Sequence, residues 1–275
     1  MKILMTIVAL FLFSISSASS QETGIDLNYK FPELENLVYR VSISGTAGWA
    51  SFDEKPMNFK LKADFLMEML NLGEIEGLYQ IKMSTRKSKI LVNDEIFEDT
   101  TDSETALSLF IPQILLQIDK KGNIHRTTIL KSGMLDFVPF LSLFPCFPDT
   151  LTAGKRWTQK IESFKLPSAK IPQLQFTYIY EGKSKGLEKI RLLSNQAINQ
   201  VLKEKDIEAK ITGKNSSDGE ILFDAKNGTL NRATGKLNLD VNYIFQVPDP
   251  DKKGKFLPVP MRIMVNLNFL FSLVK

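Results

Sequence analysis

The residues best suited to chemistry in this sequence are one histidine, one cysteine and many carboxylates. His125 is the only histidine, so a Ser-His-Asp or Cys-His site would have to use it. It lies on one arm of an expected hairpin with a charged turn around Gly122, and such arms are normally exposed. Cys146 has aromatic neighbours and no adjacent basic residue to lower its pKa. We therefore expect a surface histidine and a buried, unreactive thiol.

Because the chain has many carboxylates, a hydrolase that uses acidic residues is kept as the least favoured of the candidate functions. Asp64 and Asp240 are the pair that a short internal sequence repeat would relate. Both alternate with apolar residues on the polar side of an expected strand, which favours solvated surface acids. Transition-metal sites need several His or Cys ligands, and no phosphate loop, nucleophile elbow or dinucleotide fingerprint is found. The sequence predicts no catalytic residue, no metal and no cofactor.

The elements that must carry these side chains are predicted to be strands, because apolar residues repeat with a period of two. The clearest case is a run in which polar residues fill every gap, and two further runs repeat it. These apolar positions are Leu237, Leu239, Val241, Tyr243 and Phe245, then Met261, Ile263, Val265, Leu267, Phe269, Phe271 and Leu273, and also Leu174, Phe176, Tyr178 and Tyr180. Long strands with one apolar face predict an antiparallel sheet over an apolar interior.

Turn signals divide the rest of the chain into further strands and two short helices. Helices are expected over Ser103–Phe110 and from Ser132 or Gly133 to Leu143, with Pro145 and Pro148 after the second. Strands are expected over Val38–Phe52, Met57–Leu72, Leu78–Val92, a hairpin Ile114–Ile129, Trp157–Phe164, Leu174–Glu181, Leu187–Asn195, Asp206–Lys214, Glu220–Asp224, Thr229–Val247 and Pro258–Leu273. The predicted fold is mainly β: one or more curved antiparallel sheets or a half-barrel, with one or two short helices packed on the concave side.

The first 20 residues are typical of a secretory signal peptide. Lys2 precedes an apolar run, and small residues end at Ser20, where we expect cleavage. The run is too short to span a bilayer, which takes about 20 residues, so no transmembrane anchor is expected afterwards. Residues 21–275 are predicted to form a single mainly-β domain, with two related half-sheets at 37–130 and 155–275 left open. The expected location is periplasmic or secreted.

The charge and composition of the chain limit the classes of partner that it could bind. The chain has 35 basic and 31 acidic residues, and removal of Lys2 leaves a net charge of +3. Mixed signs along segments such as Lys60–Glu68 argue against a nucleic-acid partner, which needs basic residues on one face. A single cysteine permits no intramolecular disulfide, so stability must come from the core.

A Met-rich and Phe-rich apolar surface remains as the candidate binding site. Methionine adapts to varied apolar partners, although packing of an ordinary core is the alternative. We expect a hydrophobic cleft between the curved sheet and the second helix. Its predicted ligand-binding residues are Phe59, Phe65, Met67, Met83, Phe137 and Phe140.

A series of short motifs resembles a family of exported bacterial proteins known only as a domain of unknown function. The resemblance spans roughly Leu37 to Phe245, with Phe147 in place of the family's Leu and Lys155 in place of its Asp. It rests on Ile118-Asp-x-x-Gly122, Phe147-Pro148, Ala153-Gly-Lys-Arg-Trp157, Phe176-Thr-Tyr178, Gly219-x-x-x-Phe223-Asp and Gly228. It implies a tight turn at Gly154 that leads Trp157 into the core. It also implies an architecture similar to the half-barrel lipid and lipoprotein carriers of bacterial envelopes.

The leading hypothesis is therefore a non-enzymatic envelope protein that shelters a lipid, another apolar small molecule or a lipidated partner. An interaction or assembly module with a fully packed core and no ligand is the alternative. The identity of a protein partner is left open by the sequence.

Overall fold

The computed structural model describes residues 24–51, 55–102, 112–131, 142–161, 174–204, 207–248 and 256–274. Every regular element in these residues is a β-strand. The strands are β1 (Asn36–Ser51), β2 (Met57–Ile75), β3 (Leu78–Val92), β4 (Glu95–Asp99), β5 (Gln113–Ile118), β6 (Ile124–Lys131), β7 (Arg156–Ile161), β8 (Leu174–Ser184), β9 (Leu187–Glu204), β10 (Ile207–Asp224), β11 (Thr229–Pro248) and β12 (Phe256–Leu273).

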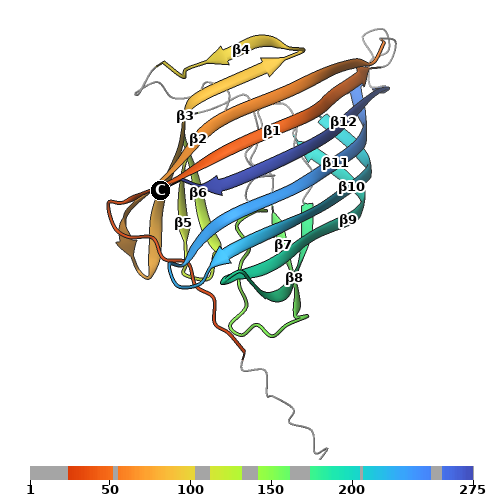
Figure 1. Ribbon diagram of the computed structural model, residues 1–275. Helices are drawn as coiled ribbons and strands as arrows, with labels where there is room; N and C mark the ends of the chain where they lie inside the picture. The colour runs from red at the N-terminus through yellow and green to blue at the C-terminus, as the bar shows by residue number, and fades with distance from the viewer. Residues whose placement is uncertain are drawn as a thin grey trace, which may run out of the picture.

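All strands belong to one antiparallel sheet of 12 strands, in the order β6-β5-β3-β2-β1-β12-β11-β10-β9-β8-β7, with β4 paired to β3. The first and last long strands, β1 and β12, pair at its centre, so both halves of the chain share the sheet. Figure 1 shows that the sheet curves, so that β5 and β6 at one edge and β7 and β8 at the other lie behind the central strands. Within the described residues the two edge strands do not pair, and the sheet stays open.

Register irregularities accompany the curvature. The β2–β3 pairing shifts between Asp64 and Leu66 and again between Asn71 and Glu74. The β8–β9 pairing shifts between Tyr180 and Gly182. Extra residues of this kind bend a strand and increase its twist, which helps a long sheet to curl over its own core.

One face of the sheet carries the main hydrophobic core, and we call it the inner face. Side chains from almost every strand meet there, because alternate residues of each strand point to the same side. Its fully buried members include Val41 of β1, Met67 of β2, Tyr178 of β8, Ile190 of β9 and Phe271 of β12. Residues one position away, such as Lys189 and Asp240, point to the outer face.

The N-terminal segment, residues 24–35, closes one end of this core. Tyr29 donates a backbone hydrogen bond to Lys120 in the β5–β6 turn, Lys30 donates one to Gly228 in the β10–β11 turn, and Leu34 donates one to Asn71 of β2. The segment therefore ties together turns from both halves of the sheet, and it runs across the lower left of Figure 1. We call this the closed end and the opposite end, with the β1–β2 and β11–β12 connections, the open end.

The predicted fold class is confirmed, and the differences have local causes. The polar run Asn215–Asp218 had suggested two strands, but β10 continues through it because its backbone pairs with β9 and β11 on both sides. The short strand β4 was not predicted. The proposed helices 103–110 and 133–143 fall mostly outside the described residues, and Leu143 itself lies in a turn. In the described ranges, no helix has the length and apolarity needed to cross a bilayer.

Candidate functional site

The inner face changes from buried to exposed along the central strands. On β12, Phe271 near the closed end is fully buried, whereas Val259 and Leu257 near the open end are 36% and 44% exposed. Neighbouring β1 follows the same trend, from the fully buried Val41 to Trp49, which is 44% exposed. The apolar alternation that builds the core thus continues past the part of the face that the core covers.

Large apolar side chains from adjacent strands lie side by side in this uncovered part. Trp49 and Phe59 lie side by side with ring centroids 5.2 Å apart. Trp49 is opposite Ile263, and Val265 is opposite both Ala47 and Leu239, so the residues form one surface across four strands. We call this the open apolar face: Trp49 of β1, Met57 and Phe59 of β2, Leu239 of β11, and Val259, Met261, Ile263 and Val265 of β12.

A second, smaller core cluster adjoins the open apolar face on the β9 to β11 side. Ile198, Ile211, Val241 and Tyr243 are buried there. Burial raises the pKa of the Tyr243 hydroxyl, so this residue is neutral at ordinary pH. The open half of the sheet therefore has a buried hydrophobic cluster of its own.

The predicted ligand-binding residues are spread over the core rather than gathered at the open end. Phe65, Met67 and Met83 are almost completely buried in the main cluster. Phe59 is half-buried and belongs to the open apolar face. Phe137 and Phe140 lie outside the described residues, so their role stays a prediction.

Sequence reasoning missed most of the open apolar face. Met57, Phe59 and Met261 belong to the Met-rich and Phe-rich surface that the sequence indicates. Ile263 and Val265 count there only as strand positions, and Trp49 is not singled out. Their alternation was visible, but a buried and an exposed apolar residue give the same pattern. Only the paired register shows that Trp49 and Ile263 occupy neighbouring positions at the uncovered end.

The carboxylates Asp64 and Asp240 do not form an acid pair. They lie on β2 and β11, which are separated by β1 and β12, and are offset by several residues along the sheet. The strand spacings place them more than about 20 Å apart, whereas glycosidase carboxylates lie roughly 5–10 Å apart. Ser42 donates a hydrogen bond to Asp64, and Arg262 donates two to Asp240, at 2.9 and 2.8 Å.

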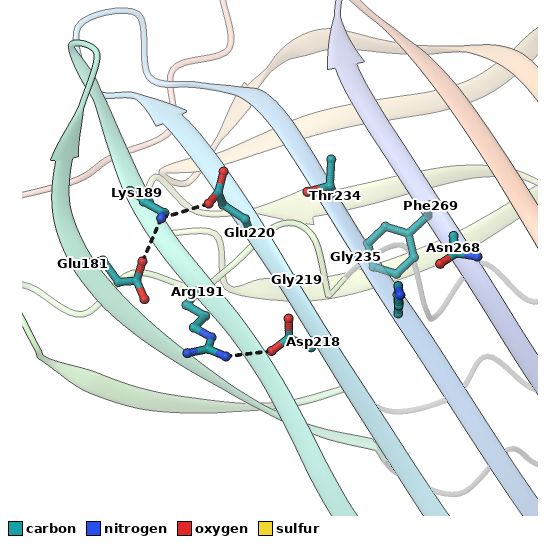
Figure 2. Close-up of a pocket in the computed structure, with 11 residues that line it drawn as sticks. Glu181, Lys189, Arg191, Asp218, Gly219, Glu220, Thr234, Gly235, Asn268 and Phe269 are labelled. Carbon is teal, nitrogen blue, oxygen red and sulfur yellow. Dashed lines mark hydrogen bonds and ion pairs between the residues drawn. The ribbon is translucent and has the colours of Figure 1, made fainter.

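A hollow of about 660 Å³ lies on the sheet between β8 and β12. Figure 2 shows Lys189 between Glu181 and Glu220, and Arg191 beside Asp218. The two carboxylates raise the pKa of Lys189 by accepting its hydrogen bonds. Five charged side chains in this hollow are thus already paired with one another, which reduces their capacity to bind a charged ligand.

His125 lies at the surface as expected, whereas Cys146 is half-buried rather than fully buried. His125 is exposed, with its Nε2 atom 3.4 Å from Asp119 Oδ2. The Cys146 thiol donates a hydrogen bond to the Gly122 carbonyl at 3.0 Å, and burial raises its pKa to about 12. These contacts lead to other groups, so the two side chains do not form a Cys-His pair. Among the described residues, no group of three His, Cys, Asp or Glu side chains could hold a metal ion.

The segment from Gly154 to Trp157 forms a turn followed by a half-buried aromatic residue. Gly154 has a φ of +82° in a turn closed by a hydrogen bond from Lys155 N to the Thr152 carbonyl. Trp157 then stacks on the buried Tyr178, with centroids 5.4 Å apart.

Comparisons with known proteins give a distant structural likeness. No family model matches the chain, and no curated protein matches it, so membership in the exported family stays a prediction. A solved structure concerned with lipid–protein interactions in lipovitellin is similar, with a TM-score of 0.45 and 11% identity. The match covers 90% of this chain and 26% of that one, so this chain spans about a quarter of the protein it matches.

Proposed function

We propose that the protein binds an apolar small molecule, such as a lipid chain, against the open apolar face and acts without catalysis. The observation that carries this proposal is the gradient from Phe271 to Val259 along β12, which leaves large apolar side chains uncovered on the inner face. Monomeric soluble proteins rarely leave contiguous apolar surface of this kind unless it binds something.

The dimensions of the open apolar face suit an acyl chain. From Val259 to Val265 a strand spans about 20 Å, and the four strands β2, β1, β12 and β11 span about 14 Å. One leaflet of a bilayer's hydrocarbon core is about 15 Å thick, so an acyl chain fits along the strands. Each methylene removed from water contributes about 0.8 kcal/mol, which provides the affinity.

Binding of the neutral apolar fluorophore N-phenyl-1-naphthylamine tests this proposal, together with native mass spectrometry of protein purified from its own host. Val265→Asp places a charge on the open apolar face and should weaken probe binding at least tenfold, since an unpaired charge is costly against an apolar chain. Asn266→Asp, on the adjacent outer position, is the matched control and should bind normally. Trp49→Ser, which removes a 44% exposed aromatic ring from the open apolar face, should also weaken binding.

Empty native protein that also takes up no probe would contradict the proposal. Equal binding by the parent protein, Val265→Asp and Trp49→Ser would place any ligand elsewhere. Near-ultraviolet circular dichroism of each variant separates lost binding from lost folding.

We also propose that the protein is exported to a periplasmic or extracellular location, because residues 1–20 have the composition of a signal peptide. N-terminal sequencing of the protein from fractionated host cells should find a start near Gln21 outside the cytoplasm. An intact Met1 in the cytoplasmic fraction would contradict export.

An interaction module is the second candidate function, favoured by the edge strand β6. Its Ile129 and Leu130 are 46% and 47% exposed, and an edge strand can pair with another chain. Light scattering over a range of concentrations should then show self-association that Leu130→Lys abolishes. A monomer at every concentration would count against a self-assembling module.

A further inference from the structure

Two buried polar side chains interrupt the apolar inner face of β10. Asn215 is fully buried and Ser217 is 7% exposed. Both point inward, because they alternate with the outer residues Lys214 and Ser216 and share their face with the buried Ile211 and Ile221. They therefore lie on the inner face between the main core and the second cluster.

Hydrogen bonds fix the orientation of the Asn215 amide. The Ser194 hydroxyl donates to the Gln175 carbonyl at 2.7 Å, so its oxygen accepts from Asn215 Nδ2 at 2.8 Å. The amide nitrogen of Asn215 is thus committed to Ser194, and the amide oxygen points elsewhere. Among the described residues, neither Asn215 Oδ1 nor Ser217 Oγ has a hydrogen-bond partner.

An unpartnered buried polar atom costs about 1–3 kcal/mol, and native proteins contain few of them. Here two occur on one strand at positions i and i+2, whose Cα atoms are about 7 Å apart. One bridging oxygen atom could therefore reach both side chains. On β10 itself, the inward positions on either side of the pair are Gly213 and Gly219, which carry no side chain.

The groups around Asn215 and Ser217 determine which kind of chemical group could bind to them. Asn215 Oδ1 requires a donor, whereas Ser217 Oγ can donate or accept. The inward neighbours are Ser194 and Gln196 on β9 and Leu237 and Leu239 on β11, all uncharged. A charged group would be buried there without a counter-charge, which is far more costly than a neutral hydroxyl.

We propose that Asn215 and Ser217 bind the uncharged, hydroxyl-bearing head of the apolar ligand whose chain lies on the open apolar face. This inference rests on the proposed function and gives it a ligand class: a neutral amphiphile such as a monoacylglycerol, rather than a fatty acid or a phospholipid. Asn215 accepts a hydrogen bond from the ligand hydroxyl, and Ser217 donates one to it. Leu239, opposite Asn215, connects the head site to the chain site.

Displacement of N-phenyl-1-naphthylamine by three ligands with the same chain tests the inference. The ligands are monolauroylglycerol, methyl laurate and laurate. We expect monolauroylglycerol to bind roughly tenfold more tightly than methyl laurate, the equivalent of one or two neutral hydrogen bonds, and more tightly than laurate.

Asn215→Leu and Ser217→Ala should reduce that preference to near unity without weakening methyl laurate. Ser216→Ala, the adjacent serine on the outer face, is the matched control and should retain the preference. Ser217→Ala removes only one oxygen atom, so it keeps the test valid if Asn215→Leu does not fold.

The outcomes separate this inference from the proposed function. Binding of all three ligands with equal affinity, or a preference that survives both variants, would overturn the head-group site and leave the apolar site intact. A complex structure in which only an ordered water joins Asn215 to Ser217, with the ligand head elsewhere, would overturn it too. If neither the fluorophore nor any ligand binds, both proposals fail.

Discussion

Tyr29 is the residue on which the closed end depends most. Its ring stacks on Phe147, with centroids 5.2 Å apart, and meets Phe223 edge-on at 5.3 Å. Its hydroxyl donates a hydrogen bond to the Pro145 carbonyl at 3.2 Å. One side chain thus joins the N-terminal segment, the loop before β7 and the end of β10. Burial raises the pKa of this hydroxyl well above its usual value, so it stays protonated and continues to donate.

Substitution of Tyr29 should separate packing from hydrogen bonding. Tyr29→Phe keeps the ring and should lower the free energy of unfolding by about 1 kcal/mol, whereas Tyr29→Ala should lower it by about 3–5 kcal/mol. Urea unfolding followed by fluorescence measures both changes. Glu35→Ala, at an exposed position of the same segment, should have little effect. A small cost for Tyr29→Ala would show that the segment does not hold this end closed.

Cys146 should report whether the closed end is intact. Because desolvation raises the pKa of the Cys146 thiol to about 12, little thiolate is present at pH 8, so the folded protein should react slowly with a thiol reagent. Unfolding in urea should restore ordinary reactivity. Iodoacetamide labelling followed by mass spectrometry measures the two rates, and rapid labelling of the folded protein would contradict the buried position.

At the residue scale, the sequence predicted those properties that depend only on a side chain and its neighbours along the chain. An unactivated Cys146 follows from its apolar neighbours, and an exposed His125 follows from its charged turn. The lack of a hydrogen-bond partner for Asn215 Oδ1 and Ser217 Oγ could not be predicted, because it depends on which groups β9 places opposite these residues.

At the element scale, the close pairing of β1 and β12 depends on Gly45. A Cβ atom at this position would lie 1.9 Å from the Asn266 carbonyl oxygen and 2.9 Å from Leu267 Cα. Gly45→Ala should therefore force the two central strands apart and cost roughly 2–4 kcal/mol of unfolding free energy. Thr46→Ala, at the exposed neighbouring position, should change stability little. Thermal unfolding of both variants makes the comparison, and an unchanged melting temperature for Gly45→Ala would contradict the register.

The Arg262–Asp240 pair joins β12 to β11 on the outer face and gives a pH-dependent contribution. Hydrogen bonds from Arg262 lower the pKa of Asp240 below 3.8. The stabilisation is therefore present above the unfolded pKa and is lost as the pH falls through the folded one. Asp240→Asn should cost less than about 1 kcal/mol at pH 7, because the pair is half-exposed, and nearly nothing in strong acid. Urea unfolding at the two pH values tests this, and an equal cost at both would contradict it.

The strands were largely predictable, because a period of two determines them locally. Their order was not, since the pairing of β1 with β12 joins the two ends of the chain and leaves no local signal. The register that brings Trp49 beside Ile263 follows from that pairing. For this reason the fold class could be predicted while the open apolar face could not.

At the scale of the whole molecule, the open sheet provides two different ends from one continuous apolar pattern. The N-terminal segment covers the closed end, where Tyr29, Phe147 and Phe223 pack together. The same alternation continues toward the open end, where Trp49 and Val259 are uncovered. Stability alone does not require apolar residues at these last positions of the strands. Their apolar character is what the proposed binding function explains.

Photo-crosslinking with a monoacylglycerol that carries a diazirine in its acyl chain tests the central claim most directly. After irradiation, peptide mass spectrometry locates the modified residues. The account predicts modification on the inner face at the open end, at Trp49, Leu239, Ile263 or Val265, and its loss in Val265→Asp. Modification confined to outer residues such as Asn238 or Asn266, or none above that of the unfolded chain, would contradict it.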